Sequence, residues 1–261
     1  MLLNICVNFY LTWKCNFQCK HCQYSCCPEE TLEMSIEQIQ YAKNILRELL
    51  TKTTSKVSVI GLSGGEPMLH SNFWKIVDDL KIIQTKGQNS FPLELHTNGS
   101  QPISQDDMNA HFKYFKTSYV ACDMFHDEFR QNTKFNELSN ISEQVILRRA
   151  DGRYRGECAN SIRLIGRAKE NYEELSENYR QLGHFCMHRS YLNGASLCFT
   201  PDKIKFCTEI GRGEYTENNS ADYYTYTLDE LIHKSIEYSL YHTGEDCKTK
   251  CFSKLVQKSD L

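Results

Sequence analysis

Three cysteines near the start of the chain, Cys15, Cys19 and Cys22, constrain the sequence more than any other feature. Thiolates are soft ligands that suit zinc, Cu(I) and iron–sulfur clusters, so a tight cysteine group predicts a metal site. A structural zinc site normally has four protein ligands, whereas a four-iron cluster on three thiolates keeps one iron open to another ligand. Cys26 and Cys27 follow closely, so a closed zinc-binding loop stays an alternative at this point.

The composition excludes several classes of protein. The 261 residues are 40% apolar, which is enough for a sizeable core, and a net charge of -3 does not favour a nucleic-acid partner. Polar residues interrupt the apolar ones at the start of the chain, so we expect no signal peptide, and no stretch reaches the roughly 18–20 apolar residues of a membrane span. We therefore expect a cytoplasmic protein whose cysteines are reduced or bind metal rather than form disulfides.

A second motif follows a predicted strand, where residues 63–67 read SGGEP. Glycines let the backbone approach a ligand closely because they carry no Cβ atom. Glu66 supplies an anionic acceptor for an ammonium group. Taken alone, this motif is also typical of an ordinary turn between a strand and a helix.

Together, the cysteine spacing, His21 just before the last cysteine and the GGEP motif resemble the radical S-adenosylmethionine (SAM) superfamily. In that family a [4Fe-4S] cluster on the three cysteines chelates SAM. One electron then cleaves SAM to a 5'-deoxyadenosyl radical, which abstracts a hydrogen atom from substrate. The resemblance implies an enzyme that needs both cofactors and an electron donor such as flavodoxin or ferredoxin. It assigns Gly64, Gly65 and Glu66 to the SAM methionine and His21 to the cofactor site.

Further residues at predicted strand ends are linked to the site by the same resemblance. Thr97 and Asn98 belong to a TNG sequence that lies near SAM in many members, although Asn-Gly is also a common turn. Asp123 and His126 resemble a strand end of peptide-modifying members, where an acid and a histidine orient substrate or relay a proton; a buried structural histidine is the alternative. Arg167, in a GRA tripeptide, suits a carboxylate of SAM or of substrate.

The order of predicted elements favours an α/β fold, a partial (β/α)6 TIM-like barrel with a C-terminal hairpin and helix. Expected strands cover residues 3–11, 56–62, 92–96, 119–122 and 161–165, and expected helices cover residues 36–50, 73–85, 106–115, 135–149 and 228–241. We expect residues 1–170 to form the radical SAM domain, too short for the full barrel of about 250 residues. The polar residues 171–181 indicate a linker to a second domain, 171–261.

This second domain contains a further group of cysteines. Alternating runs around Pro201-Asp202 predict a β-hairpin. The region resembles the twitch or SPASM extension, which binds an auxiliary iron–sulfur cluster, but Asp202 stands where that pattern has a glycine. The implied ligands are Cys186, Cys207, Cys247 and Cys251, with Cys198 as the competitor of Cys186. A structural zinc site made from the same cysteines is the alternative.

The leading interpretation of function is a radical SAM enzyme that matures a ribosomal peptide (a RiPP precursor) by crosslinking, thioether formation or epimerisation. If the reaction returns a hydrogen atom to the substrate, the lone Cys158 is the expected donor. Alternatives within enzymes are a small-molecule dehydrogenase of the aminosugar type and a glycyl-radical activase. Outside enzymes, the alternative is a zinc-binding module.

Overall fold

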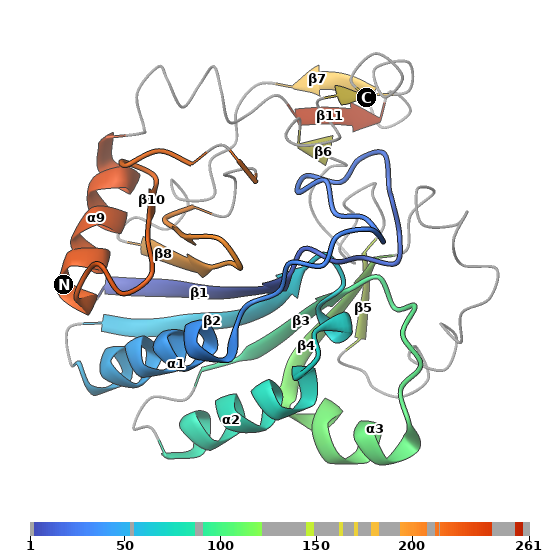
Figure 1. Cartoon of the computed structure of the whole chain (residues 1–261), viewed down its shortest axis with the longest axis horizontal. Coiled ribbons are helices and arrows are strands. Elements are labelled where there is room, and N and C mark those ends of the chain that lie inside the picture. Colours follow the sequence, from blue (N-terminus) through green and yellow to red (C-terminus); the bar gives the residue numbers. More distant parts are fainter. Residues whose placement is uncertain are drawn as a thin grey trace.

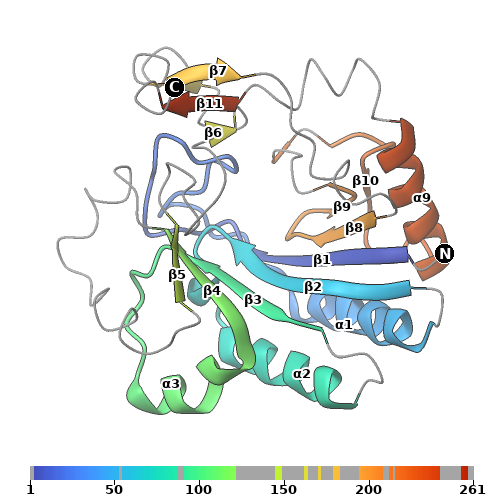
Figure 2. The same cartoon turned by 180° about the vertical axis from the view of Figure 1, so that it is seen from behind.

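The protein, seen in a computed structural model, has a mixed α/β fold built on an eight-stranded, mostly parallel sheet (Figure 1). The structure describes residues 3–52, 55–86, 91–121, 145–148, 162–163, 170–171, 179–182, 194–207, 212–213, 215–241 and 254–257. The predicted α/β class is confirmed. A smaller three-stranded sheet lies on the side of the cysteine-bearing loop (Figures 1 and 2).

The main sheet has the strand order β10-β9-β8-β1-β2-β3-β4-β5. Its strands are β1 (Leu3–Thr12), β2 (Ser55–Gly64), β3 (Leu93–Thr97), β4 (Phe115–Ala121), β5 (Val145–Arg148), β8 (Gly194–Phe199), β9 (Ile204–Lys205) and β10 (Ser220–Ala221). From β1 to β5 each strand is parallel to the next, and β8 pairs parallel with β1 on its other side. The hairpin β8–β9 was expected, but not its place beside β1 in the main sheet.

Helices α1 (Ile36–Thr51), α2 (Phe73–Lys86) and α9 (Leu228–Tyr241) cover one face of this sheet (Figure 2). Helix α1 begins with a capping box, in which Ser35 Oγ accepts from Gln38 N and Gln38 Oε1 accepts from Ser35 N. Lys43 joins α1 to α2 by a 2.6 Å ion pair with Asp79. Among the helices that the structure describes, none is long and apolar enough to cross a membrane.

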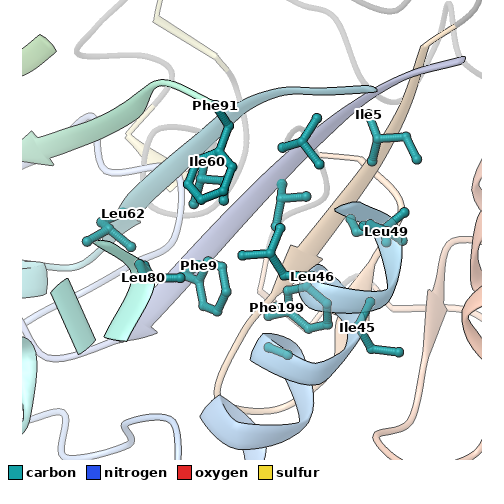
Figure 3. Close-up of a cluster of buried hydrophobic side chains, with 14 of the residues drawn as sticks. Ile5, Phe9, Ile45, Leu46, Leu49, Ile60, Leu62, Leu80, Phe91 and Phe199 are labelled. Atoms are coloured by element: carbon teal, nitrogen blue, oxygen red, sulfur yellow. The ribbon is translucent and has the colours of Figure 1, made fainter. Parts of the chain in front are cut away.

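The hydrophobic core lies between these helices and the sheet (Figure 3). Successive side chains of a strand point to opposite faces, and in β1 the apolar Val7 and Phe9 face the helices. Leu46 and Leu49 of α1 pack against them, as does Phe199 of β8. The helical spacing of the apolar residues in the sequence therefore predicts which face of α1 is buried.

Two predictions in the middle of the chain were wrong. Val145–Arg148 was expected in a helix, but it forms β5, because its apolar, β-branched residues pair in parallel with β4. The expected helix 106–115 is shorter: α3 (Gln105–His111) and the 3-10 turn Phe112–Tyr114 end before Phe115, where β4 begins.

Strand β6 (Ile162–Arg163) was expected in the parallel sheet, and this too was wrong. It pairs antiparallel with β11 (Lys254–Gln257), which also pairs with β7 (Tyr179–Leu182). Residues 171–181, expected as a linker, thus contain the start of β7. The sequence of a short apolar segment does not show which strand it pairs with. The partner of β6 is β11, which lies far away in the sequence.

Replacing Leu46, which is fully buried, with alanine should lower the free energy of unfolding by about 2–5 kcal/mol, because it leaves a cavity in the core. Urea denaturation measures the loss. The exposed Glu48→Ala on the same helix is the matched control and should stay within about 0.5 kcal/mol of the parent protein. Equal losses in the two variants would contradict the assigned core face.

Candidate functional site

Cys15, Cys19 and Cys22 lie on one loop that leaves the carboxyl end of β1 and returns beside it, called here the cysteine loop (residues 13–33). Backbone hydrogen bonds join its two halves, from Trp13 N to Leu32 O at 2.9 Å and from Cys15 N to Cys27 O at 3.1 Å. Within the loop, Cys22 N donates to Cys19 O at 3.1 Å. These backbone hydrogen bonds therefore hold the segments that carry the three thiols in a defined arrangement.

The thiols occupy a largely water-free environment. Cys15 and Cys19 are only 8% and 7% exposed, whereas Cys22 is partly exposed. Burial raises the pKa of the Cys15 thiol to about 12, so its thiolate needs a nearby cation to form. Soft sulfur donors on a fixed, buried loop fit an iron–sulfur cluster, whose iron supplies that positive charge.

Cys26 is buried beside the same group. A hydrogen bond with Cys22, and after it burial, raise the pKa of the Cys26 thiol well above its usual range. Across the described residues, no three side chains of the metal-binding types converge on a single ion. The structure thus places a fourth cysteine near the three of the motif.

Gly64 lies directly against the end of β1, and Gly65 lies against the backbone at the start of the cysteine loop. A Cβ atom on Gly65 would come within 2.2 Å of Lys14 O, and one on Gly64 within 2.4 Å of Thr12 O. Gly65 N donates to Thr12 O at 2.7 Å. The sequence predicts that these glycines admit a ligand, and the structure shows in addition their close contact with Thr12 at the end of β1 and with Lys14 of the cysteine loop.

The carboxylate of Glu66 is fully buried at the end of β2. It accepts hydrogen bonds from Thr97 Oγ1 at 2.8 Å and from Asn98 N at 2.8 Å, both at the end of β3. Met68 N donates to it at 3.1 Å. Glu66 therefore joins the ends of β2 and β3. A carboxylate can accept about four hydrogen bonds in all.

Asn98 extends this network to the cysteine loop. Its side-chain Nδ2 donates to Asn16 Oδ1 at 3.0 Å and lies 3.6 Å from Cys15 Sγ. The network from Glu66 through Asn98 to Cys15 thus joins the three predicted motifs, which are far apart in the sequence. Thr97 and Asn98, both buried, thus lie beside Glu66 and the cysteine loop.

The other predicted site residues have varied positions. His21 is partly exposed in the turn before Cys22. Cys198 packs among the residues of the cysteine loop, and Cys207 packs in the main core. Outside the described residues lie Asp123, His126, Cys158, Arg167, Cys186, Cys247 and Cys251.

The sheet face opposite the helices carries polar residues that the sequence analysis did not single out. The strand register aligns Asn8 of β1 with Gly61 of β2 and with Glu94 of β3. Nearer the cysteine loop, His96 of β3 aligns with Tyr119 of β4. Parallel strands buried on both faces are usually apolar throughout, so a polar row suggests contact with water or a ligand.

These polar side chains contact one another. The rings of His96 and Tyr119 stack at 4.8 Å, and His96 Nε2 lies 3.9 Å from Glu94 Oε2. The side chains of His96 and Glu94 are 26% and 23% exposed. The absence of a Cβ on Gly61 makes room for Asn8 Oδ1, 2.5 Å from where that atom would stand. The alternation Leu93-Glu94-Leu95-His96 was the sequence signal for this face.

Comparison with known protein families identifies the family to which a chain with this site belongs. The sequence profile of the Radical SAM superfamily matches residues 9–182, which contain the cysteine loop, the GGEP motif and the TNG turn. The chain belongs to the radical SAM superfamily. Its members are enzymes that use a [4Fe-4S] cluster and SAM, and the thiols described above fit that cluster.

Individual relatives resemble this radical SAM protein only in part. The mycofactocin maturase MftC of Mycolicibacterium smegmatis is 36% identical over 74 residues, 28% of this chain and 17% of the maturase. An S-adenosylmethionine-dependent nucleotide dehydratase of Selenomonas ruminantium is 35% identical over 118 residues, 45% of this chain and 38% of the dehydratase. The chain thus matches well under half the length of these relatives.

The crystal structure of BtrN in complex with AdoMet and 2-DOIA has a similar fold over nearly the whole chain. Its TM-score is 0.58 at 15% identity, with 99% of this chain and 94% of BtrN covered. At this identity the likeness concerns the fold.

Replacing Thr97 with valine removes the hydroxyl that donates to Glu66 and leaves a buried carboxylate short of a donor. We expect a loss of about 1–3 kcal/mol in the free energy of unfolding, measured by urea denaturation. Thr97→Ser keeps the hydroxyl and is the matched control. If serine and valine destabilise the protein equally, the hydrogen bond to Glu66 does not hold the strand ends together.

Proposed function

We propose that this protein cleaves SAM reductively with a [4Fe-4S] cluster bound by Cys15, Cys19 and Cys22. The network from Glu66 through Asn98 to Cys15 carries the proposal, because it joins the GGEP and TNG motifs to the first cysteine of the loop. When bound, and with one electron from an external donor such as flavodoxin or ferredoxin, the cluster and SAM would supply the 5'-deoxyadenosyl radical that abstracts a hydrogen atom from substrate, with methionine as the other product of SAM cleavage.

The residues of the chain bind and orient these cofactors. Gly65 and Glu66 donate their backbone N–H groups to Thr12 O and Lys14 O, which holds the start of the cysteine loop against the end of β2, and the Glu66 carboxylate fixes the end of β3 beside it. We assign SAM to this meeting point of strand ends, within reach of His21 and Asn98. Ligands in parallel α/β sheets bind at the carboxyl ends of the strands, which supports the assignment.

Residues beyond the described part complete the proposal by family resemblance. Arg167 is assigned to a carboxylate, Asp123 and His126 to the substrate, and Cys158 to hydrogen-atom return in an epimerisation. For an auxiliary cluster, we propose Cys186 and Cys207 as ligands, with Cys198 as the alternative to Cys186. Cys247 and Cys251 would complete this second set of ligands.

Anaerobic reconstitution tests the cofactors. We expect about eight irons per chain, and about four with no SAM cleavage once Cys15, Cys19 and Cys22 are all replaced with alanine. Iron analysis and 5'-deoxyadenosine release on reduction measure the two effects. Cys26→Ser is the matched control and should keep both, because only three thiolates hold the SAM cluster. A protein that binds zinc alone, or cleavage in the triple variant, would contradict the assignment.

The substrate we propose first is a ribosomal peptide that is crosslinked, bridged by a thioether or epimerised. The relative that is a maturase supports this choice. A second candidate is dehydrogenation of a small molecule of the aminosugar type. The polar row of Asn8, Glu94 and His96 favours it, because a carboxylate and an imidazole bind hydroxyl and amino groups. A glycyl-radical activase has no such support among the described residues.

Substitutions in the polar row test whether it contacts substrate. Amino sugars or a precursor peptide encoded beside the gene serve as probes, and the stimulation of 5'-deoxyadenosine release is measured. With the probe that stimulates the parent protein, Glu94→Gln and His96→Phe should reduce the stimulation by about tenfold or more, since each removes a charge-assisted hydrogen bond.

Lys116→Ala, at an exposed position of β4, is the control for these two variants and should keep the stimulation. Full stimulation in both His96→Phe and Glu94→Gln would rule out substrate contact on this face.

A further inference from the structure

The β8–β9 hairpin touches the cysteine loop at a point that no family motif assigns. Asp202 Oδ1, in the turn of the hairpin, accepts a hydrogen bond from Trp13 Nε1 at 2.8 Å. Trp13 is fully buried and stands two residues before Cys15. A buried indole N–H requires an acceptor, and here the acceptor comes from a segment nearly two hundred positions away.

The turn holds Asp202 in place before any cofactor binds. Thr200, fully buried, donates its backbone N–H to Lys203 O at 3.0 Å, and its hydroxyl lies 3.0 Å from Asp202 Oδ1. Gln38 at the start of α1 donates to Pro201 O at 2.9 Å. The carboxylate is therefore presented to Trp13 by a turn that is anchored on both sides.

Arg212 reinforces the contact between Trp13 and Asp202, because it lies near both side chains. Its guanidinium lies 5.8 Å from the centre of the Trp13 ring, and its Nε is 3.8 Å from Asp202 Oδ2. It also forms an ion pair with Glu30, on the returning half of the cysteine loop. Arg212 thus links the first residue of the loop, its last turn and the hairpin.

The Trp13 ring connects these contacts to the cysteines. It packs against Tyr10 at 5.8 Å and Tyr24 at 5.3 Å, and the two tyrosine hydroxyls are hydrogen-bonded at 3.0 Å. Lys205 of β9 lies over both tyrosine rings, at 4.5 and 4.7 Å. Cys15, Cys19 and Cys26 belong to the same buried cluster. Movement of Trp13 would therefore displace the thiols.

We propose that Asp202 and Arg212 are positioning residues that fix the cysteine loop through Trp13 and hold its thiols in the arrangement that retains the cluster. This inference rests on the proposed function. It also accounts for an aspartate where the twitch pattern has a glycine, because a glycine has no side-chain oxygen to accept the indole hydrogen bond. A hydrogen bond to a carboxylate is about twice as strong as one between neutral groups, which suits this anchoring role.

A double-mutant cycle on iron release tests the proposal. With a chelator under anaerobic conditions, Asp202→Ala and Trp13→Phe should each release iron from the reconstituted protein about tenfold faster. The double variant should release it no faster than either single variant, because both remove the same bond. Asp202→Asn keeps an acceptor and should restore most of the retention.

Asp222→Ala is the control, since it breaks the exposed ion pair with Lys203 on the same hairpin and should leave iron release unchanged. Unchanged release in Asp202→Ala, or additive effects in the double variant, would overturn the proposal.

A second measurement needs no metal. The chain has two tryptophans, Trp13 and Trp74, so hydrogen exchange of the Trp13 indole N–H is followed by NMR with Trp74 as internal reference. Asp202→Ala should speed exchange at Trp13 by about tenfold or more and leave Trp74 unchanged. Equal exchange in parent and variant would overturn the proposal. If the parent protein retains no cluster, the proposed function fails while this measurement still tests the contact.

Discussion

The buried carboxylate of Glu66 is the interaction on which the candidate site depends. A charge removed from water is costly unless hydrogen bonds compensate it, and Glu66 is fully buried. Its compensation comes from Thr97, Asn98 and Met68, which lie at two different strand ends. Separating β2 from β3 would leave the charge without Thr97 and Asn98, so the ends of the two strands are held in one arrangement.

The same sheet has two faces with different roles. In β1 the alternation puts Val7 and Phe9 against the helices and Asn8 and Tyr10 on the opposite face. Packing on the helix side supplies stability, which leaves the other face free to carry polar groups. On this face, burial raises the pKa of the Cys6 thiol to about 11, and the nearby Glu94 carboxylate adds a smaller increase.

Features set by neighbouring residues were predictable from the sequence. The helix start at Ser35 and the helix Leu228–Tyr241 follow from local capping and periodicity, and both match the structure. The cysteine and GGEP motifs identified the family because their chemistry is local as well. The sequence predicted that Gly65 lets the backbone approach a ligand, whereas only the fold reveals its close contact with Lys14 of the cysteine loop.

Features set by distant residues could not be predicted in the same way. Val145–Arg148 has an apolar pattern that suits a short strand or a buried helix, and pairing with β4 decides between them. Glu94 and His96 alternate visibly with leucines, yet a single strand does not show which of its faces meets the helices.

The position of β8 beside β1 has the widest consequence. It brings residues from the second half of the chain next to the cysteine motif near its start. Its parallel pairing with β1 runs from Asn4↔Gly194 to Phe9↔Phe199, so the chain leaves β8 beside the point where the cysteine loop begins. The turn that follows then lies against Trp13, and Phe199 fills the core under α1. The domain boundary at residue 170 stays a prediction. Even so, the hairpin cannot leave this sheet without exposing Phe199 and removing the acceptor of the Trp13 indole, so the first residue of the cysteine loop is tied to a hairpin from the second half of the chain.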